Sequence, residues 1–178
     1  MRYVSIDIET TGLRPQQDQI LQLAMVVEDT RYPEVPVEEL PYFCCFVKHV
    51  EYHGNAYALG LNAWILDLLS GRTKAACRYP IWDLDEMTRA AGSFLSDQLG
   101  MRDKINVAGK NAAGFDIPFL PQDLRDRFRH RVIDPGSVFV DWSKDRLPAL
   151  GDLIDTEVTH DALGDARDVI TCLRRSYT

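Results

Sequence analysis

The first 50 residues contain three strand-like segments in succession, and this order constrains the fold more than any other feature. The first segment alternates in character, with Val4, Ile6 and Ile8 on one face, as expected of a strand that buries one side. Turn-forming and proline-rich stretches separate the segments. We therefore expect the three strands to form an antiparallel meander. They cover residues 2–8, 20–29 and 42–50.

After residue 50, the expected elements alternate between helices and strands. A strand-first order followed by this alternation predicts an α/β fold, with a mixed central β-sheet whose first three strands are antiparallel, flanked by α-helices. No repeat, low-complexity tract or linker divides the chain, so we expect residues 1–178 to form a single domain. Helices are expected at 55–70, 82–100, from 115 onwards and at 160–176, and strands at 104–111 and 137–142.

The composition is that of a globular protein, with 46% hydrophobic and 26% charged residues. No apolar run reaches the roughly 18 residues of a membrane span, so no membrane association is expected. Met1 leads directly into a strand-like run, which predicts a protein without a signal peptide and a cytoplasmic location. The four cysteines form no C-x-x-C pair, so we expect reduced thiols rather than a metal site.

The formal net charge of −7 argues against non-specific DNA binding through a basic surface. That argument is weak if bound metal ions offset a cluster of acids. Basic residues are dense between Arg125 and Arg131, where a solvated helix end is at least as good an interpretation as a phosphate contact.

Two acids end the first strand-like segment, in the string SIDIETTGL. Side chains at positions i and i+2 of a strand share a face, so Asp7 and Glu9 project together, opposite the apolar face. Neighbouring carboxylates repel each other unless a cation or a proton lies between them. The alternative is a pair of exposed acids at a strand end, which is common in proteins.

A third acid, Asp116, follows a loop of small residues in GKNAAGFDIPFL. Leu120 and Leu124 lie four and eight residues later, on the same helical stripe. A carboxylate in line with an apolar stripe is costly to bury without a partner. The alternative role for Asp116 is a helix N-cap, which aspartate favours.

The last predicted helix carries several acids, in HDALGDARD. At 100° per residue, Asp165 lies nearest to the apolar stripe, whereas Asp161 and Asp168 point further towards solvent. His160 stands at the start of this helix, where its ring has room to move. An ordinary surface or capping histidine is the alternative for His160.

Divalent-metal chemistry connects these residues. Mg²⁺ prefers oxygen ligands and takes a few carboxylates together with waters and phosphate oxygens. Two such ions activate an attacking water and stabilise the leaving oxygen of a phosphodiester, and a histidine that titrates near neutrality can accept the proton of the water. No cluster of cysteines or histidines suggests zinc.

Three strings, in this order, resemble the motifs of the DEDDh 3′–5′ exonucleases, which include polymerase proofreading domains, RNase T and oligoribonuclease. SIDIETTGL is similar to the first motif, AGKNAAGFDIPFL to the second, and HDALGDARD to the third. The third has the H-x-x-x-x-D spacing of the histidine branch. Together the motifs span residues 5–168.

The resemblance implies an RNase H-like fold and hydrolysis from the 3′ end of single-stranded DNA or RNA, with release of 5′-mononucleotides. It assigns one metal to Asp7, Glu9 and Asp165, with Asp7 bridging to a second metal and Asp116 helping directly or through water. His160 would be the general base. The metals would be two Mg²⁺ ions, with Mn²⁺ as a substitute.

The resemblance also implies contacts to the terminal nucleotide. Leu13 would wedge against the last bases, although a plain core leucine is the alternative. The second motif departs from the family pattern, because its loop is one residue longer and reads N-x-x-x-F-D. This departure weakens Asn111 as a substrate contact more than Asp116. The predicted substrate-binding residues are Glu9, Thr10, Leu13, Asn111, Phe115 and His160.

Two other functions remain open from the sequence. One is a catalytically silent domain that binds nucleic acid or a protein, which would have no chemical need for His160. The other is a phosphodiesterase that acts on very short oligonucleotides. The sequence favours neither DNA nor RNA. A homodimer through residues 55–69, or a polymerase or repair partner, is as consistent with the sequence as a monomer.

Overall fold

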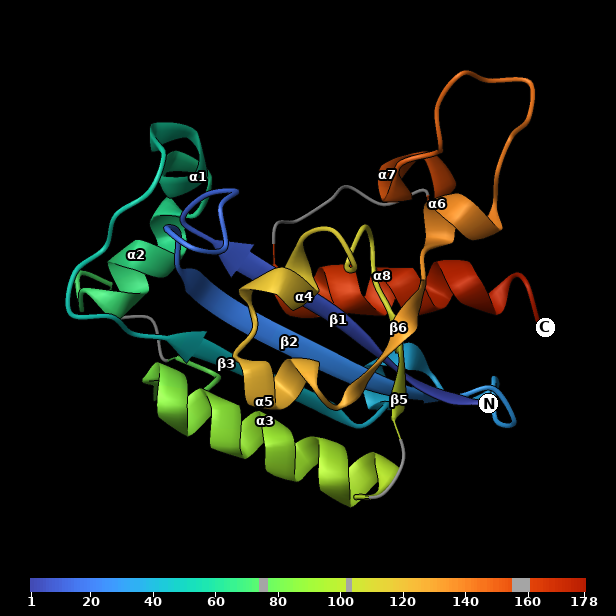
Figure 1. Cartoon of the computed structure of the whole chain (residues 1–178), viewed down its shortest axis with the longest axis horizontal. Helices are drawn as coiled ribbons and strands as arrows, with labels where there is room; N and C mark the ends of the chain where they lie inside the picture. Colours follow the sequence, from blue (N-terminus) through green and yellow to red (C-terminus); the bar gives the residue numbers. More distant parts are fainter. Residues whose placement is uncertain (74–76, 102–103, 155–160) are drawn as a thin grey trace.

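The computed structural model describes residues 1–73, 77–101, 104–154 and 161–178. Within this part of the chain, six strands form one sheet in the order β4-β3-β2-β1-β5-β6 (Figure 1). Strands β1, β2 and β3 are antiparallel neighbours, which confirms the predicted meander. The other pairings are parallel, so the sheet is mixed as expected. The strands are β1 Arg2–Thr10, β2 Ile20–Asp29, β3 Tyr42–Val47, β4 Ile81–Trp82, β5 Ile105–Ala108 and β6 Phe128–Ile133.

Helices cover both faces of this sheet (Figure 1). Helix α8 packs across β1 and β2 on one face, and α3 with α5 covers the other. A capping box of Asp83 and Glu86 starts α3, and Gly100 follows its last residue. The helices are α1 Ala56–Leu61, α2 Ala63–Leu69, α3 Leu84–Leu99, α4 Asp116–Phe119, α5 Gln122–Arg125, α6 Pro135–Val138, α7 Leu150–Leu153 and α8 Ala162–Arg174, with a short 3-10 helix at Val37–Glu39.

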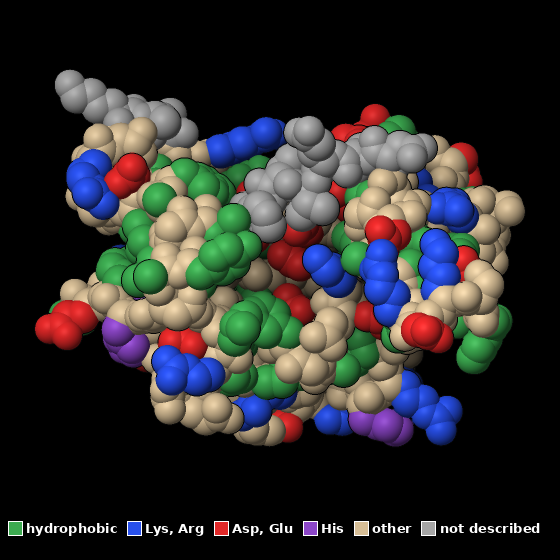
Figure 2. Space-filling view, turned by 90° about the horizontal axis from the view of Figure 1, so that it is seen from above, with side chains coloured by type: hydrophobic (Ala, Val, Ile, Leu, Met, Phe, Trp, Pro, Cys, Tyr) green, Lys and Arg blue, Asp and Glu red, His purple; other side chains and the backbone are tan. Residues whose placement is uncertain are grey.

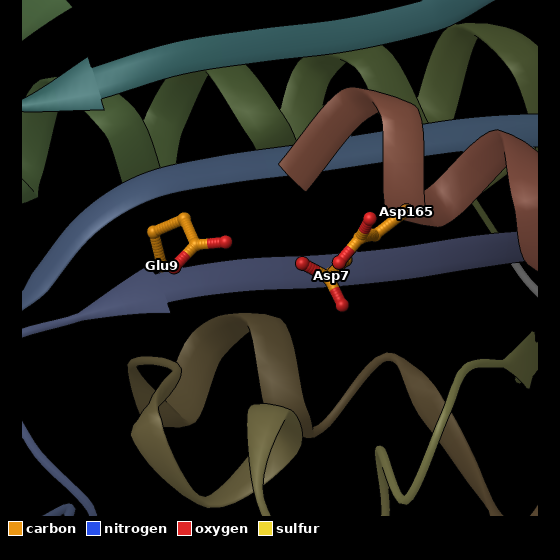
Figure 3. Close-up of side chains that lie close together, drawn as sticks. All are labelled: Asp7, Glu9 and Asp165. Carbon is orange, nitrogen blue, oxygen red and sulfur yellow. The ribbon is translucent and has the colours of Figure 1, made fainter. Parts of the chain in front are cut away.

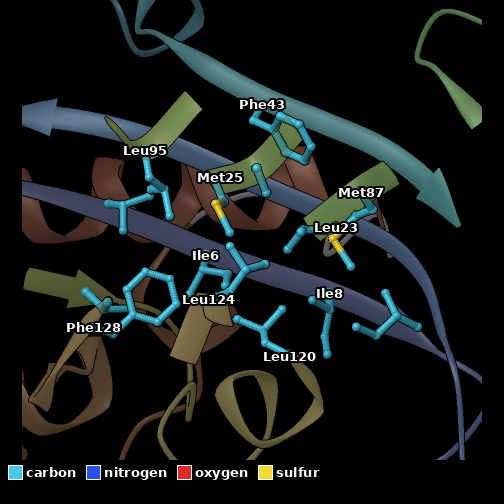
Figure 4. Packing of buried hydrophobic residues seen from close by; sticks show 14 of the residues in the cluster. Ile6, Ile8, Leu23, Met25, Phe43, Met87, Leu95, Leu120, Leu124 and Phe128 are labelled. Carbon is cyan, nitrogen blue, oxygen red and sulfur yellow. The ribbon is translucent and has the colours of Figure 1, made fainter. Parts of the chain in front are cut away.

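The alternation of β1 separates two environments. Val4, Ile6 and Ile8 pack with α3 and α5 in a wholly apolar cluster (Figure 4). Each large aliphatic side chain buried in this way contributes about 1.5–3 kcal/mol to stability. The other face of β1 carries Tyr3, which packs towards α8, and Asp7 further along the strand. The apolar cluster therefore fixes the strand, and its opposite face is left for polar groups.

Two predicted helices are interrupted. The helix expected at 55–70 is divided into α1 and α2 at Asn62, whose backbone leaves the helical conformation with ψ of 20°. The helix expected from residue 115 is two short turns, α4 and α5. Leu120 is extended with ψ of 148° because it precedes Pro121, which disfavours helical backbone at the preceding residue.

The last strand was predicted in the wrong place. Residues 137–142 are not a strand, because Asp134 caps α6 and Pro135 occupies its first turn, where proline is tolerated. The strand is β6 instead, at Phe128–Ile133, on the edge of the sheet. Its basic residues are exposed, as is usual for an edge strand that avoids pairing with other chains. The solvated helix end considered for this stretch holds for Arg125, the exposed last residue of α5, whereas Arg129 and Arg131 belong to the strand.

Among the described residues, no helix combines the length and the apolarity that a membrane span needs. That residues 1–178 form a single domain stays a prediction.

Candidate active site

Asp7 and Glu9 project from the same face of β1, towards α8 (Figure 3). Glu9 is buried, with 7% of its surface exposed, and Asp7 is partly buried. In the antiparallel register, Glu9 lies opposite Gln22 of β2, and the register shifts immediately after Glu9. The prediction that the two acids share one face is confirmed, and the alternative of two exposed acids is wrong.

Asp165 reaches the same place from the first turns of α8 (Figure 3). The Nε2 atom of Gln22 donates to Oδ1 of Asp161 at 2.7 Å, and the N–H of Ala162 donates to Oε1 of Gln22 at 3.2 Å. These two hydrogen bonds fasten the start of α8 to β2. As predicted, Asp165 is more buried than Asp161 or Asp168.

The three acids form a compact group. One carboxylate oxygen from each of Asp7, Glu9 and Asp165 lies within 4.8 Å of the others. These ligand atoms are hard oxygens, the donor type that Mg²⁺ and Mn²⁺ prefer. The three carboxylates therefore fit the predicted divalent-metal site.

Asp116 approaches β1 from the opposite side, at the start of α4. It is 2% exposed, and its Oδ1 accepts a hydrogen bond from the backbone N–H of Ile8 at 3.0 Å. This N–H is available because the pairing of β1 with β5 involves only Val4 and Ser5. The N-cap of α4 is Phe115 rather than Asp116, so the capping alternative for Asp116 is wrong.

Burial and mutual repulsion raise the pKa values of these acids. Burial raises the pKa of Asp7 well above its usual range, and the charges of Asp116, Asp165 and Glu9 raise it further. Burial raises the pKa of Glu9 to about 7, with a further increase from Asp165. Asp116 also has a pKa raised to about 7, first by burial and then by the charge of Glu9. Each carboxylate therefore disfavours ionisation of the others.

The described residues supply little positive charge to offset the repulsion among Asp7, Glu9 and Asp116. In the described part of the chain, Asp7, Glu9 and Asp116 form no ion pair. Lys110, near the start of the loop that follows β5, lowers the pKa of all three at longer range. A cluster of buried carboxylates without a cationic partner is unfavourable unless protons or metal ions neutralise it.

The acids lie in a hollow of about 550 Å³. Figure 2 shows acidic side chains in a depression near the centre of one face, with hydrophobic side chains on one side and Lys and Arg on the other. Leu13 stands at the rim and is 74% exposed, so the alternative of a core leucine is wrong. Besides the acids, the lining includes Thr10, Leu13, Asn55, Tyr57, Leu61, Asn62, Lys110, Asn111 and Phe115.

The structure brings together four of the predicted substrate contacts with Glu9, namely Thr10, Leu13, Asn111 and Phe115. Asn111 adopts a left-handed conformation with φ of 54°, and its N–H donates to Oδ2 of Asp134 at 2.6 Å. The longer loop of the second motif is thus accommodated with Asn111 still at the hollow. His160 lies outside the described residues.

Sequence reasoning missed Asn55, Asn62 and Lys110 among the polar residues of the hollow. Asn62 was read as part of an uninterrupted helix, although an asparagine in a helix interior is a weak helix former and is a signal for a break. Lys110 stands directly beside Asn111 in the second motif, and its position there was the available signal.

Comparisons with known proteins reveal a similarity of fold to two solved structures. Neither a known family model nor a curated protein matches the sequence. Among solved structures, Exonuclease I of E. coli, in complex with a dT13 oligonucleotide, matches 99% of this chain and 41% of its own, at 18% identity and a TM-score of 0.64. A moderately thermophilic Exonuclease I from Methylocaldum szegediense matches 97% of this chain and 39% of its own, at 19% identity and a TM-score of 0.66.

This chain therefore spans about two fifths of the length of these solved structures. At such identities the likeness concerns the fold, and it confirms the predicted RNase H-like α/β architecture. Both neighbours are exonucleases, the class of enzyme that the three motifs resemble.

Proposed function

We propose that this chain is a divalent-metal-dependent 3′–5′ exonuclease that hydrolyses single-stranded nucleic acid. The observation that carries this proposal is the convergence of the carboxylate oxygens of Asp7, Glu9 and Asp165 within 4.8 Å, in a hollow of about 550 Å³. The fold that the chain shares with Exonuclease I supports the same function.

Asp7, Glu9 and Asp165 would hold one metal ion, and Asp7 would bridge to a second. When bound, two Mg²⁺ or Mn²⁺ ions supply an activated water and neutralise the leaving oxygen. Asp116 has one oxygen committed to the N–H of Ile8, so its other oxygen remains for a metal, directly or through water. His160 would take the proton of the attacking water.

The lining of the hollow suits the 3′ end of a nucleic-acid strand. Leu13, Tyr57, Leu61 and Phe115 form an apolar wall against which a terminal base and sugar can pack. The hydroxyl of Thr10 is already used, since it donates to the carbonyl of Gly12 at 2.6 Å. Thr10 would therefore contact the terminal nucleotide through its backbone or its methyl group.

Lys110 would bind a phosphate. It is exposed at the edge of the hollow and forms no ion pair with any described residue. A free ammonium group beside a cluster of acids is suited to a non-bridging phosphate oxygen as the strand enters. The dT13 oligonucleotide bound to Exonuclease I supports single-stranded DNA as the first substrate to test.

The test uses 5′-labelled single-stranded DNA and RNA of one sequence, with Mg²⁺ or Mn²⁺, and the Asp7→Asn variant as control. We expect a ladder that shortens from the 3′ end, releases 5′-mononucleotides, and is absent in EDTA and in the variant. Circular single-stranded DNA should resist cleavage, because it has no 3′ end.

Three other outcomes would change the proposal. Cleavage of circular DNA would replace the exonuclease with an endonuclease. Degradation of only the shortest oligomers would indicate a short-oligonucleotide phosphodiesterase. Binding of the linear strand without cleavage would indicate a silent nucleic-acid-binding domain.

A further inference from the structure

Asn62 occupies the corner between α1 and α2, beside the end of β1. Its backbone N–H donates to the carbonyl of Ala58 at 3.0 Å and closes α1, and its carbonyl accepts from the N–H of Ile65 at 3.0 Å and opens α2. The side chain is turned inward, so that only 2% of the residue is exposed, and it lines the acidic hollow.

The side-chain amide of Asn62 holds the end of β1. Its Nδ2 donates to the backbone carbonyl of Thr10 at 3.0 Å. The amide also lowers the pKa of the neighbouring Glu9, against the larger effect of burial. The hydrogen bond to Thr10 thus fixes the backbone directly after Glu9.

The end of β1 needs a stabilising contact in addition to its pairing with β2. The register between β1 and β2 shifts between Glu9 and Thr10. A glutamate also has three rotatable side-chain bonds, so its carboxylate is not fixed by the backbone alone. Groups that orient the ligands of a metal ion without binding it themselves are commonly required for metal binding.

The side-chain oxygen of Asn62 is an unsatisfied acceptor. This Oδ1 atom is buried and accepts no hydrogen bond from any described residue. A buried carbonyl without a donor is unfavourable for stability. The amide therefore satisfies the Thr10 carbonyl while its own oxygen stays unsatisfied, so its net contribution to stability is reduced.

We propose that Asn62 is a positioning residue, whose hydrogen bond to the Thr10 carbonyl fixes the end of β1, and with it Glu9, so that the three-acid group binds a divalent metal ion. This inference rests on the proposed function, since it assigns a metal to Asp7, Glu9 and Asp165. The same corner carries Tyr57 and Leu61 of the apolar wall. Asn62 therefore links the wall for the terminal nucleotide to the metal ligands.

The test measures Mn²⁺ binding and thermal stability in Asn62→Leu and Asn62→Ala. Both variants lack the donor, but leucine fills the space and alanine leaves a cavity. The control is Ile65→Val, which loosens the packing of α2 on Leu21 and Phe46 without touching the amide. Mn²⁺ binding to the free protein is read by electron paramagnetic resonance, without any substrate.

We expect both Asn62 variants to bind Mn²⁺ about 10- to 100-fold more weakly, by similar factors, whatever their melting temperatures. Ile65→Val should melt lower and bind Mn²⁺ as the wild type does. If Mn²⁺ affinity in the Asn62 variants instead follows the melting temperature, or equals that of the wild type, the inference is overturned.

The two proposals fail in different ways. If the wild type binds no Mn²⁺ at all, the metal-dependent function and this inference both fail. If the wild type binds Mn²⁺ and the Asn62 variants lose it, but no strand is cleaved, the positioning role stands and the exonuclease fails. If strands are cleaved while the variants keep their Mn²⁺ affinity, only the positioning role fails.

Discussion

Helix α8 buries carboxylates against β1 and β2 at both of its ends, and the two ends differ in what neutralises the charge. At the C-terminal end, Glu28 of β2 is fully buried and pairs with Arg174, whose Nε lies 2.7 Å from Oε2. At the N-terminal end, Asp165 meets Asp7 and Glu9.

The difference separates a structural acid from a candidate functional one. Glu28 has a permanent partner in the chain, and Arg174 is further held by the carbonyl of Val35 at 2.8 Å. At the other end, burial and the charge of Asp165 raise the pKa values of Asp7 and Glu9, and neither of these two acids forms an ion pair with a described residue. We expect substitutions at the two ends to affect stability and activity in opposite ways.

The largest effect is expected for Asp7→Asn. Removing one metal ligand should lower the rate of strand cleavage on the order of 10³-fold, equivalent to about 4 kcal/mol of transition-state stabilisation. The metal-free variant should nevertheless melt at a higher temperature than the wild type, because one repelling charge is gone. Cleavage assays and thermal melts in EDTA check this pair of effects, and a lower melting temperature would contradict the repulsion.

Glu28→Gln should show the reverse pattern. The substitution leaves the guanidinium of Arg174 without its buried partner, which costs about 3 kcal/mol of unfolding free energy. Below the melting transition, the rate of cleavage should stay close to that of the wild type. Denaturant unfolding and cleavage assays on the same preparation check this. A large loss of activity in the folded variant would contradict a purely structural role for Glu28.

The next largest expected effect is a pH dependence of stability that comes from the acids of the hollow. Glu9 and Asp116 have pKa values of about 7 in the folded protein, above those of the unfolded chain, so the folded state holds more protons between these values. Stability of the metal-free protein should therefore fall as pH rises from about 4 to about 7, by several kcal/mol.

Mg²⁺ should remove most of this fall, because it replaces the protons as the neutralising charge. Melts across this pH range, with Mg²⁺ and with EDTA, check the prediction. A metal-free stability that rises over the same range would mean that the raised pKa values are wrong.

Lys110→Gln should have the smallest effect. Loss of one phosphate contact should weaken strand binding several-fold and reduce the slope of log affinity against log salt by about 1. Binding to Asp7→Asn as background, over a range of salt concentrations, measures this without cleavage. A matched substitution, Lys144→Gln, removes a cation that pairs with Asp141 away from the hollow, and it should leave the slope unchanged.

The sequence by itself determined the features that depend on local periodicity. The two-residue repeat of β1 placed Asp7 and Glu9 on one face, and the helical repeat of α8 selected Asp165 over Asp161 and Asp168. The three-stranded meander followed from the same rules, because these periods belong to the backbone and need no partner. His160 lies outside the described residues, and its role stays a prediction.

Tertiary structure alone decided which distant groups meet and what surrounds them. Packing of α8 on β1 brought Asp165 within 4.8 Å of Asp7 and Glu9, across more than 150 residues of sequence. The break at Asn62 and the edge strand β6 were also invisible to periodicity. Both depend on burial and on hydrogen-bond partners elsewhere in the chain, and these override local propensity when the chain folds.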